Sequence, residues 1–122
     1  LEMGAVPIVS AVAAESYRSA NGGGRIAGFF VRKKPKEHGV QALIEGLDDT
    51  QTLEGRRVMI VEDVTTTGGS ILQAVEAARA AGAEIAGILT VVDRNEGAGE
   101  AVAGHGLALT SLFTAADFAD PA

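Results

Sequence analysis

The sequence predicts an α/β fold, with a mostly parallel, twisted sheet flanked by helices. The first observation behind this prediction is that short apolar runs alternate with segments in which apolar residues recur at helical spacing. The second is that residues 58–61 are continuously apolar, which is typical of a strand buried on both faces of a parallel sheet. The chain has 122 residues, 47% of them hydrophobic, so we expect one domain over residues 1–122.

The first part of the chain is expected to form a helix, a strand and a long loop. Apolar residues recur at helical spacing over residues 7–19, and Pro7 suits a first helical turn. Glycines at 22–24 end that pattern, and residues 26–31 form a short apolar run that we expect to be a strand of the sheet. Residues 35–54 have no sustained period, so we expect a functional or mobile loop there, in which a hairpin is an open alternative.

The second part alternates strand and helix more clearly. A strand over residues 58–61 leads to Glu62 and Asp63, and a helix follows Gly68 and Gly69 and stops at Gly82. We then expect a strand over residues 85–92, a short helix over 100–105, a strand over 107–113 and a turn over 114–118.

Charged residues follow three of the predicted strands. They are Arg32 and Lys33, Glu62 and Asp63, and Asp93 and Arg94. In open α/β sheets ligands bind outside the carboxyl ends of the strands. We therefore expect these three strand ends to converge on one crevice.

The composition excludes several classes of function. Sixteen acidic residues against ten basic ones give a net charge of −6, so we expect neither nucleic acid nor a membrane as partner. The absence of cysteine excludes a disulfide framework, a thiolate nucleophile and a cysteine zinc site, and it suits a cytoplasmic protein. No apolar run approaches the roughly 20 residues that span a bilayer, and the first residues lack the features of a signal peptide.

Residues 58–70 combine a buried strand, two carboxylates, a loop of hydroxyls and glycines, and a helix start. The backbone N–H groups of such a loop and the helix N-terminus suit a phosphate, and the hydroxyls add donors. A phosphate disfavours carboxylates beside it, so we expect Glu62 and Asp63 to serve sugar hydroxyls or Mg²⁺ of the same ligand. These features indicate a phosphoribosyl ligand, the alternative being a helix-capping turn; the patterns of a Walker loop and of a dinucleotide fingerprint are absent.

This motif resembles the signature of the type I phosphoribosyltransferases, which bind 5-phosphoribosyl 1-pyrophosphate (PRPP). The signature is shared by members that act on different nucleobases. The resemblance implies the type I phosphoribosyltransferase core fold. It also implies that PRPP is bound by Glu62, Asp63, Val64, Thr65, Thr66, Thr67, Gly68, Gly69 and Ser70.

A second motif is strongly basic. Residues 32–38 carry a net charge of +3 against −9 for the rest of the chain, which indicates an anion-binding loop, the alternative being a solvated charged face. Arg-Lys-Lys-Pro-Lys-Glu-His-Gly closely resembles the mobile loop of orotate phosphoribosyltransferases, which corresponds to about residues 33–50 here. By that resemblance Arg32, Lys33, Lys36 and His38 contact the pyrophosphate of PRPP, and loop residues reach into the neighbouring site of a homodimer.

The resemblance also implies catalytic and base-binding roles. Lys36 and His38 would supply protons or hydrogen bonds to the departing pyrophosphate, and Asp63 joins them as a catalytic residue. Arg94, together with Thr66, would bind orotate, with a forked pair of hydrogen bonds from the arginine to the orotate carboxylate. The alternative for Arg94 is a surface ion pair with its neighbour Asp93.

The resemblance therefore implies an orotate phosphoribosyltransferase, a Mg²⁺-dependent pentosyltransferase that makes orotidine 5′-monophosphate for UMP biosynthesis. A purine-type phosphoribosyltransferase and a non-catalytic PRPP-binding module remain open. Whole family members carry further residues before the part that corresponds to Leu1. These residues form an N-terminal helix and part of the hood, the region that covers the orotate ring, so we expect both to be absent here. His105 lies between two glycines and is expected to be exposed in a turn.

Overall fold

The β-strands form two separate sheets in the part of the chain that the computed structural model describes, which is residues 2–19, 25–34, 43–47 and 50–118. The larger sheet has three parallel strands in the order β3-β4-β5, and the smaller sheet pairs β1 with β2 antiparallel. The elements in chain order are α1 (Glu2–Ser19), β1 (Phe30–Val31), β2 (Ile44–Glu45), β3 (Arg57–Thr65), α2 (Gly69–Ala80), β4 (Glu84–Asp93), α3 (Ala98–Ala103), β5 (Leu109–Thr114) and the 3-10 turn η1 (Ala115–Phe118).

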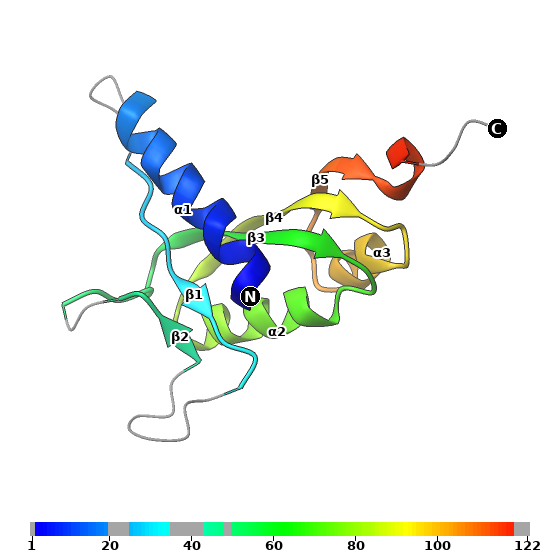
Figure 1. The fold of residues 1–122 in the computed structure, drawn as a ribbon. Coiled ribbons are helices and arrows are strands. Elements are labelled where there is room, and N and C mark those ends of the chain that lie inside the picture. Colours follow the sequence, from blue (N-terminus) through cyan, green and yellow to red (C-terminus); the bar gives the residue numbers. More distant parts are fainter. Residues whose placement is uncertain (1, 20–24, 35–42, 48–49, 119–122) are drawn as a thin grey trace.

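The three-stranded sheet confirms the predicted α/β class. β3 pairs with β4 through Ile60 and Ile88, and β4 pairs with β5 through Ile88 and Leu109. α2 connects β3 to β4 and α3 connects β4 to β5, which are the crossovers that parallel neighbours require. Figure 1 shows α2 and α3 on one side of this sheet and α1 on the other. None of the helices in the described residues is long and apolar enough to cross a membrane.

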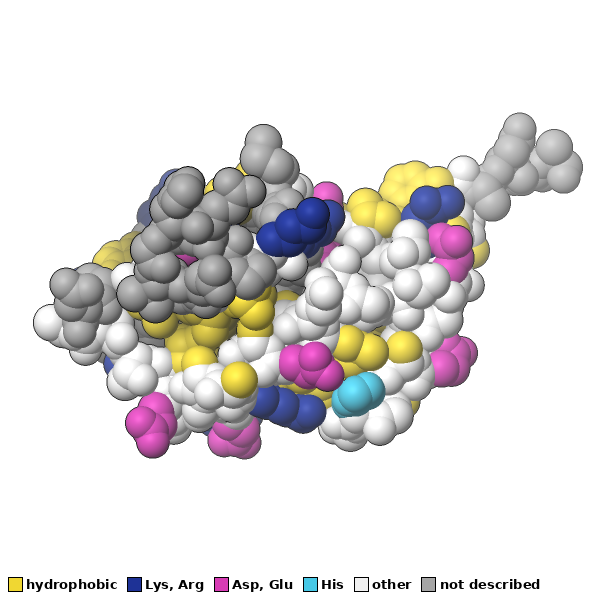
Figure 2. Space-filling view, turned by 90° about the horizontal axis from the view of Figure 1, so that it is seen from below, with side chains coloured by type: hydrophobic (Ala, Val, Ile, Leu, Met, Phe, Trp, Pro, Cys, Tyr) yellow, Lys and Arg dark blue, Asp and Glu magenta, His cyan; other side chains and the backbone are white. Residues whose placement is uncertain are grey.

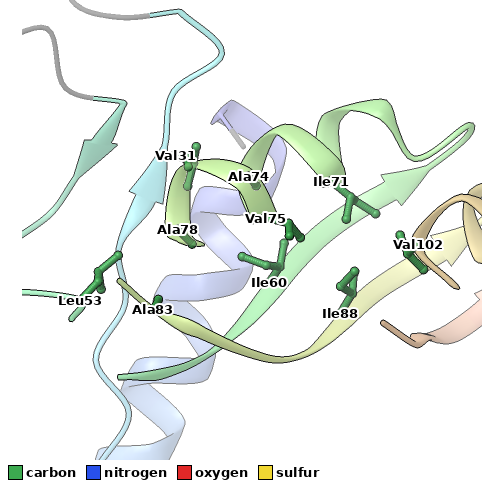
Figure 3. Close-up of a cluster of buried hydrophobic side chains, with 11 residues drawn as sticks. Val31, Leu53, Ile60, Ile71, Ala74, Val75, Ala78, Ala83, Ile88 and Val102 are labelled. Atoms are coloured by element: carbon green, nitrogen blue, oxygen red, sulfur yellow. The ribbon is translucent and has the colours of Figure 1, made fainter. Parts of the chain in front are cut away.

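The hydrophobic core lies between the sheet and α2. Ile60 and Ile88 project from neighbouring strands toward Ile71 and Val75 of α2, and Val102 of α3 lies beside them (Figure 3). Ile71, Val75, Ile88 and Val102 are each at most 1% exposed. Burying side chains of this size stabilises the fold by about 1.5–3 kcal/mol each. The core therefore holds α2 against β3 and β4.

The strand that the sequence predicts over residues 26–31 is much shorter in the structure and does not join the parallel sheet. Only Phe30–Val31 is a strand, and it pairs antiparallel with Ile44–Glu45. The residues before it run along α1 instead: the Ile26 N–H donates to Ser16 Oγ at 2.9 Å, and a Cβ at Gly28 would collide with Val9. These contacts with the helix take the place of strand pairing.

The boundaries of other elements also differ from the prediction. α1 begins at Glu2 rather than at Pro7, so Pro7 lies inside the helix, where it cannot donate the backbone hydrogen bond of its turn. β3 continues through Glu62 and Asp63 to Thr65, because its last residues pair with the end of β4. α3 and β5 are displaced by one or two residues, since the left-handed Gly97 starts the helix early and the turn at 104–106 delays the strand.

Candidate active site

The loop between β3 and α2 rests directly on α3. Gly68, the residue before α2, is buried and has φ +93°, a conformation that favours glycine. A Cβ at this position would lie 3.3 Å from Ala98 Cα and 3.4 Å from Ala101 Cβ. The glycine is therefore required both by its backbone conformation and by the close approach of α3.

The hydroxyls of this loop face outward rather than capping the helix. Thr67 and Ser70 are exposed and Thr66 is half-buried, and none of the three hydroxyls takes part in a hydrogen bond within the described part of the chain. Gly69, in the first turn of α2, is exposed as well. This arrangement favours an anion cradle over the alternative of a helix-capping turn, because hydroxyls and the first N–H groups of α2 are available to a ligand.

Glu62 is a buried acid at the carboxyl end of β3. Its side chain is 5% exposed, and Oε2 has no hydrogen-bond partner among the described residues. Burial above all, and to a lesser extent the charge of the adjacent Asp63, raises the pKa of Glu62 to about 7. The hydroxyl oxygen of Thr65, a residue that is 3% exposed, is likewise buried and has no hydrogen-bond partner among the described residues. Buried polar atoms are normally hydrogen-bonded, so two such atoms at one strand end indicate a place where a polar ligand or water binds.

Asp63 lies against the first turn of α1. A Cβ at Gly4 would collide with the Asp63 carboxylate, so only glycine lets the helix backbone come this close. The Thr90 hydroxyl, fully buried on β4, reaches the Asp63 carbonyl oxygen at 3.4 Å and the Val92 carbonyl oxygen at 3.2 Å. The sequence did not predict Gly4 as part of the site. A glycine has no functional group, and the only feature that could have drawn attention to Gly4 is that it stands three residues before Pro7.

Arg94 follows β4 and is tied to the end of β3. Its N–H donates to the Thr65 carbonyl oxygen at 2.9 Å, and Nε lies 3.3 Å from Glu96 Oε2. Among the described residues Arg94 makes no ion pair with Asp93, whose Oδ1 accepts the N–H of Asn95 at 2.9 Å. The structure thus brings the ends of β3 and β4 together as predicted, but the ion pair of Arg94 is with Glu96.

The strand that leads into the basic motif belongs to the smaller sheet and not to the parallel one. Arg32 follows β1, on the two-stranded sheet, and its guanidinium contacts Glu45 Oε1 at 3.1 Å and the Lys34 carbonyl oxygen at 3.2 Å. Lys33 is exposed beside it. The described contacts of Arg32 are therefore with its own sheet, and not with the ends of β3 and β4. Lys36 and His38, and the loop from residue 35 to 42, lie outside the described residues.

Val64 and His105 are the two remaining residues for which the sequence made a prediction. Val64 is 46% exposed and contributes no polar group. His105 is exposed in a turn as predicted. Figure 2 shows one face of the molecule, on which a histidine side chain, in cyan, lies close to acidic and basic side chains. Within the described ranges, no group of three or more His, Cys, Asp or Glu side chains is placed to hold a metal ion.

The chain is similar to known proteins of one family. A family model described as the phosphoribosyl transferase domain matches residues 1–105. The orotate phosphoribosyltransferase of Rhodopseudomonas palustris (strain BisB18) is 56% identical over 118 residues, which cover 97% of this chain and 62% of that protein. The orotate phosphoribosyltransferase of Pyrococcus furiosus is 50% identical over 111 residues, which cover 91% of this chain and 54% of that protein. The chain thus spans less than two thirds of the length of these curated relatives.

Solved structures share the fold. The Mycobacterium tuberculosis orotate phosphoribosyltransferase in complex with PRPP matches with a TM-score of 0.76 at 39% identity, over 97% of this chain and 61% of that chain. The Aeropyrum pernix orotate phosphoribosyltransferase matches with a TM-score of 0.76 at 32% identity, over 96% of this chain and 59% of that chain. Because the family model covers residues 1–105 and the fold is shared with these structures, the chain belongs to the phosphoribosyl transferase domain family.

Proposed function

We propose that the protein transfers ribose 5-phosphate from PRPP to orotate, giving orotidine 5′-monophosphate and pyrophosphate, in the cytoplasmic synthesis of UMP. The observation that carries this proposal is the buried Glu62 carboxylate, whose Oε2 has no partner among the described residues, next to a loop of outward-facing hydroxyls. Ribose offers hydroxyl donors to a carboxylate, and a phosphate accepts from hydroxyls and N–H groups. The names of the relatives, all orotate phosphoribosyltransferases, support the same activity.

PRPP is proposed to lie across the end of β3. Glu62 and Asp63 accept hydrogen bonds from the ribose hydroxyls, and the loop from Thr65 to Ser70 holds the 5-phosphate. The N-terminus of α2 favours the negative charge of that phosphate, since helix N-termini carry a partial positive charge. Val64 continues the strand between the two groups and contributes only its backbone. The relative from M. tuberculosis was solved with PRPP, which supports this ligand class for the family.

Orotate is proposed to lie beside the ribose, next to the end of β4. The Arg94 backbone is held by Thr65 at 2.9 Å, so its guanidinium starts from a fixed point beside the PRPP site. Two parallel hydrogen bonds from a guanidinium fit a planar carboxylate, which orotate has and the purine bases lack. Thr66 is proposed to add a hydroxyl to the orotate site.

Mg²⁺ is proposed to enter with PRPP. In proteins Mg²⁺ is commonly bound through one or two carboxylates plus the phosphates of the substrate. Glu62 and Asp63 supply two adjacent carboxylates, and one buried oxygen of Glu62 has no partner among the described residues. Mg²⁺, when bound, neutralises charge on the diphosphate.

The departing pyrophosphate is proposed to be stabilised by Arg32, Lys33, Lys36 and His38, with loop residues shared between the subunits of a homodimer. Cations at a leaving group act most strongly when charge develops there in the transition state. Replacing Lys36 by Ala should therefore lower turnover by about 100-fold or more while weakening PRPP binding far less. Equal effects on turnover and on PRPP binding would contradict a transition-state role for Lys36.

The activity is tested by following the absorbance of orotate with purified protein, PRPP and Mg²⁺. A fall in orotate absorbance that requires PRPP is the expected result. Parallel reactions with adenine, hypoxanthine or xanthine identify a purine enzyme if only these bases are consumed. PRPP binding without turnover of any base would instead identify a non-catalytic binding module, and either of these results would refute the proposal.

A further inference from the structure

The turn that carries Arg94 is fixed on both sides of that residue. Before it, the ladder between β3 and β4 ends in the bond from the Arg94 N–H to the Thr65 carbonyl oxygen, at 2.9 Å. After it, Asp93 Oδ1 accepts the Asn95 N–H at 2.9 Å, and Asn95 takes φ +59°, which asparagine tolerates better than most residues. The backbone at Arg94 is therefore well defined, while its side chain is 59% exposed and long enough to adopt many conformations.

Glu96 is the group that restricts this side chain. Its Oε2 lies 3.3 Å from Arg94 Nε, and both side chains are about half exposed, at 59% and 47%. Exposed ion pairs contribute only about 0–1 kcal/mol to folding, so stability is a poor reason for this contact. The contact does limit the directions in which the guanidinium can point.

The atom of Arg94 that Glu96 contacts shows whether Glu96 would compete with a substrate for Arg94 or would position the Arg94 side chain. A carboxylate that competed with a substrate for Arg94 would occupy the two terminal nitrogens, Nη1 and Nη2, which form the end of the guanidinium fork. Glu96 contacts Nε, on the side of the fork. A substrate carboxylate would instead meet the end of the fork, where Nη1 and Nη2 lie.

We propose that Glu96 is a positioning residue, which holds the Arg94 guanidinium so that its Nη1 and Nη2 groups meet the carboxylate of the base substrate. This inference rests on the proposed function, because it assumes that Arg94 binds the orotate carboxylate. Holding a flexible side chain in its binding conformation removes part of the entropy cost of binding. Glu96 thus acts through Arg94 and not by touching the substrate.

Steady-state kinetics with Glu96→Gln test the inference. The variant should raise the KM for orotate about five-fold, with the KM for PRPP and the melting temperature unchanged. Glu96→Asp, which keeps the charge, should recover part of the loss. Glu100→Gln removes the same charge four residues further along the chain, and it should leave both KM values unchanged.

A double-variant cycle shows whether Glu96 acts through Arg94. In an Arg94→Ala background, Glu96→Gln should have no further effect on the KM for orotate, because the group that it positions is gone. A five-fold rise in the KM for orotate that persists in the Arg94→Ala background would overturn the inference. A KM for orotate that stays the same or falls in the single Glu96→Gln variant would overturn it as well. Failure of the proposed function is distinguishable, because the unsubstituted protein would then consume no orotate, and this inference would fall with it.

Discussion

Glu62 combines three properties that rarely occur together in one carboxylic acid. It is almost fully buried, it neighbours a second acid, and one of its oxygens has no hydrogen-bond partner among the described residues. A group in this condition costs stability unless something binds to it. The same group is well suited to accept a hydrogen bond from a ribose hydroxyl, because a carboxylate with little water around it binds a donor more strongly.

The first prediction concerns the pH dependence of stability. Glu62 loses its proton near pH 4.5 in the unfolded chain and near pH 7 in the folded protein, so the folded state binds this proton more tightly. The stabilisation that results is complete below about pH 4.5 and is lost as the pH rises to about 7. Relative to Glu62→Gln, the unsubstituted protein should lose up to about 3 kcal/mol of unfolding free energy over this range.

Urea unfolding of both proteins at pH 4.5 and at pH 8 measures this difference. The Gln variant cancels the contribution of all other titrating groups, since these are common to both proteins. A difference between the two proteins that is independent of pH, or that grows in the opposite direction, would show that Glu62 is not an acid with a raised pKa.

The second prediction concerns Gly4, where α1 meets Asp63. Gly4→Ala adds a methyl group that collides with the Asp63 carboxylate, so the carboxylate must move. We expect the KM for PRPP to rise about ten-fold or more, while stability changes little, because alanine favours a helix by about 1 kcal/mol over glycine. Gly99→Ala is the matched control: Gly99 is also helical and has no neighbour within 4 Å. If both variants leave the KM unchanged, the close approach at Gly4 does not matter for PRPP.

The loop between β3 and α2 depends on α3 as much as on its own sequence. Gly68 touches Ala98 and Ala101, and α3 itself begins directly after the turn that carries Arg94. The loop that we assign to the phosphate and the turn that we assign to the base are therefore both next to α3. A disturbance at this contact should reach both of them.

The third prediction separates backbone conformation from packing at two glycines. Gly68 and Gly97 both have a left-handed backbone, at φ +93° and +103°, but a Cβ meets α3 only at Gly68. Gly97→Ala should cost about 1–2 kcal/mol of unfolding free energy from conformation alone. Gly68→Ala should cost more and should also abolish PRPP binding, measured by calorimetry. Equal losses of stability with PRPP binding retained would show that contact with α3 is unimportant.

The sequence predicts the elements of the parallel sheet well, because each carries its own local signal. The apolar run at 58–61 and the helical spacing that ends at Gly82 identify β3 and α2, and the charges at 93–94 mark the end of β4. The prediction of a strand over residues 26–31 was wrong, and the reason lies outside that segment. Ile26 and Gly28 lie against α1, and no pattern within six residues reveals that neighbour.

The candidate site was predictable in its residue types and less so in its contacts. The acidic pair and the loop of hydroxyls stood out because their chemistry is visible in the sequence. The contact of Gly4 with Asp63 and the ion pair of Arg94 with Glu96 depend on how segments meet in space. In the same turn Asp93 Oδ1 accepts the Asn95 N–H, a contact that the sequence pattern did not predict either.

Across the whole molecule, charge is distributed in favour of an anionic ligand despite the acidic total. The net charge is −6, yet residues 32–38 carry +3, and Arg94 adds a cation beside the end of β3. Local positive potential raises the rate at which anions arrive, and salt screens this effect. In the function that we propose, Glu62 and Asp63 distinguish a ligand with ribose hydroxyls from a simple polyphosphate.

Calorimetric titration of PRPP with Mg²⁺ tests this account most directly, with the unsubstituted protein compared to the double variant Glu62→Gln/Asp63→Asn. Hydrogen bonds to charged groups contribute about 1.5–3 kcal/mol each, so we predict that PRPP binds the double variant at least about 100-fold more weakly. Pyrophosphate without Mg²⁺, which has no ribose, should bind the double variant no more weakly than the unsubstituted protein. Equal affinity of both proteins for PRPP would contradict the assignment of the acidic pair to the ribose, and with it the proposed site.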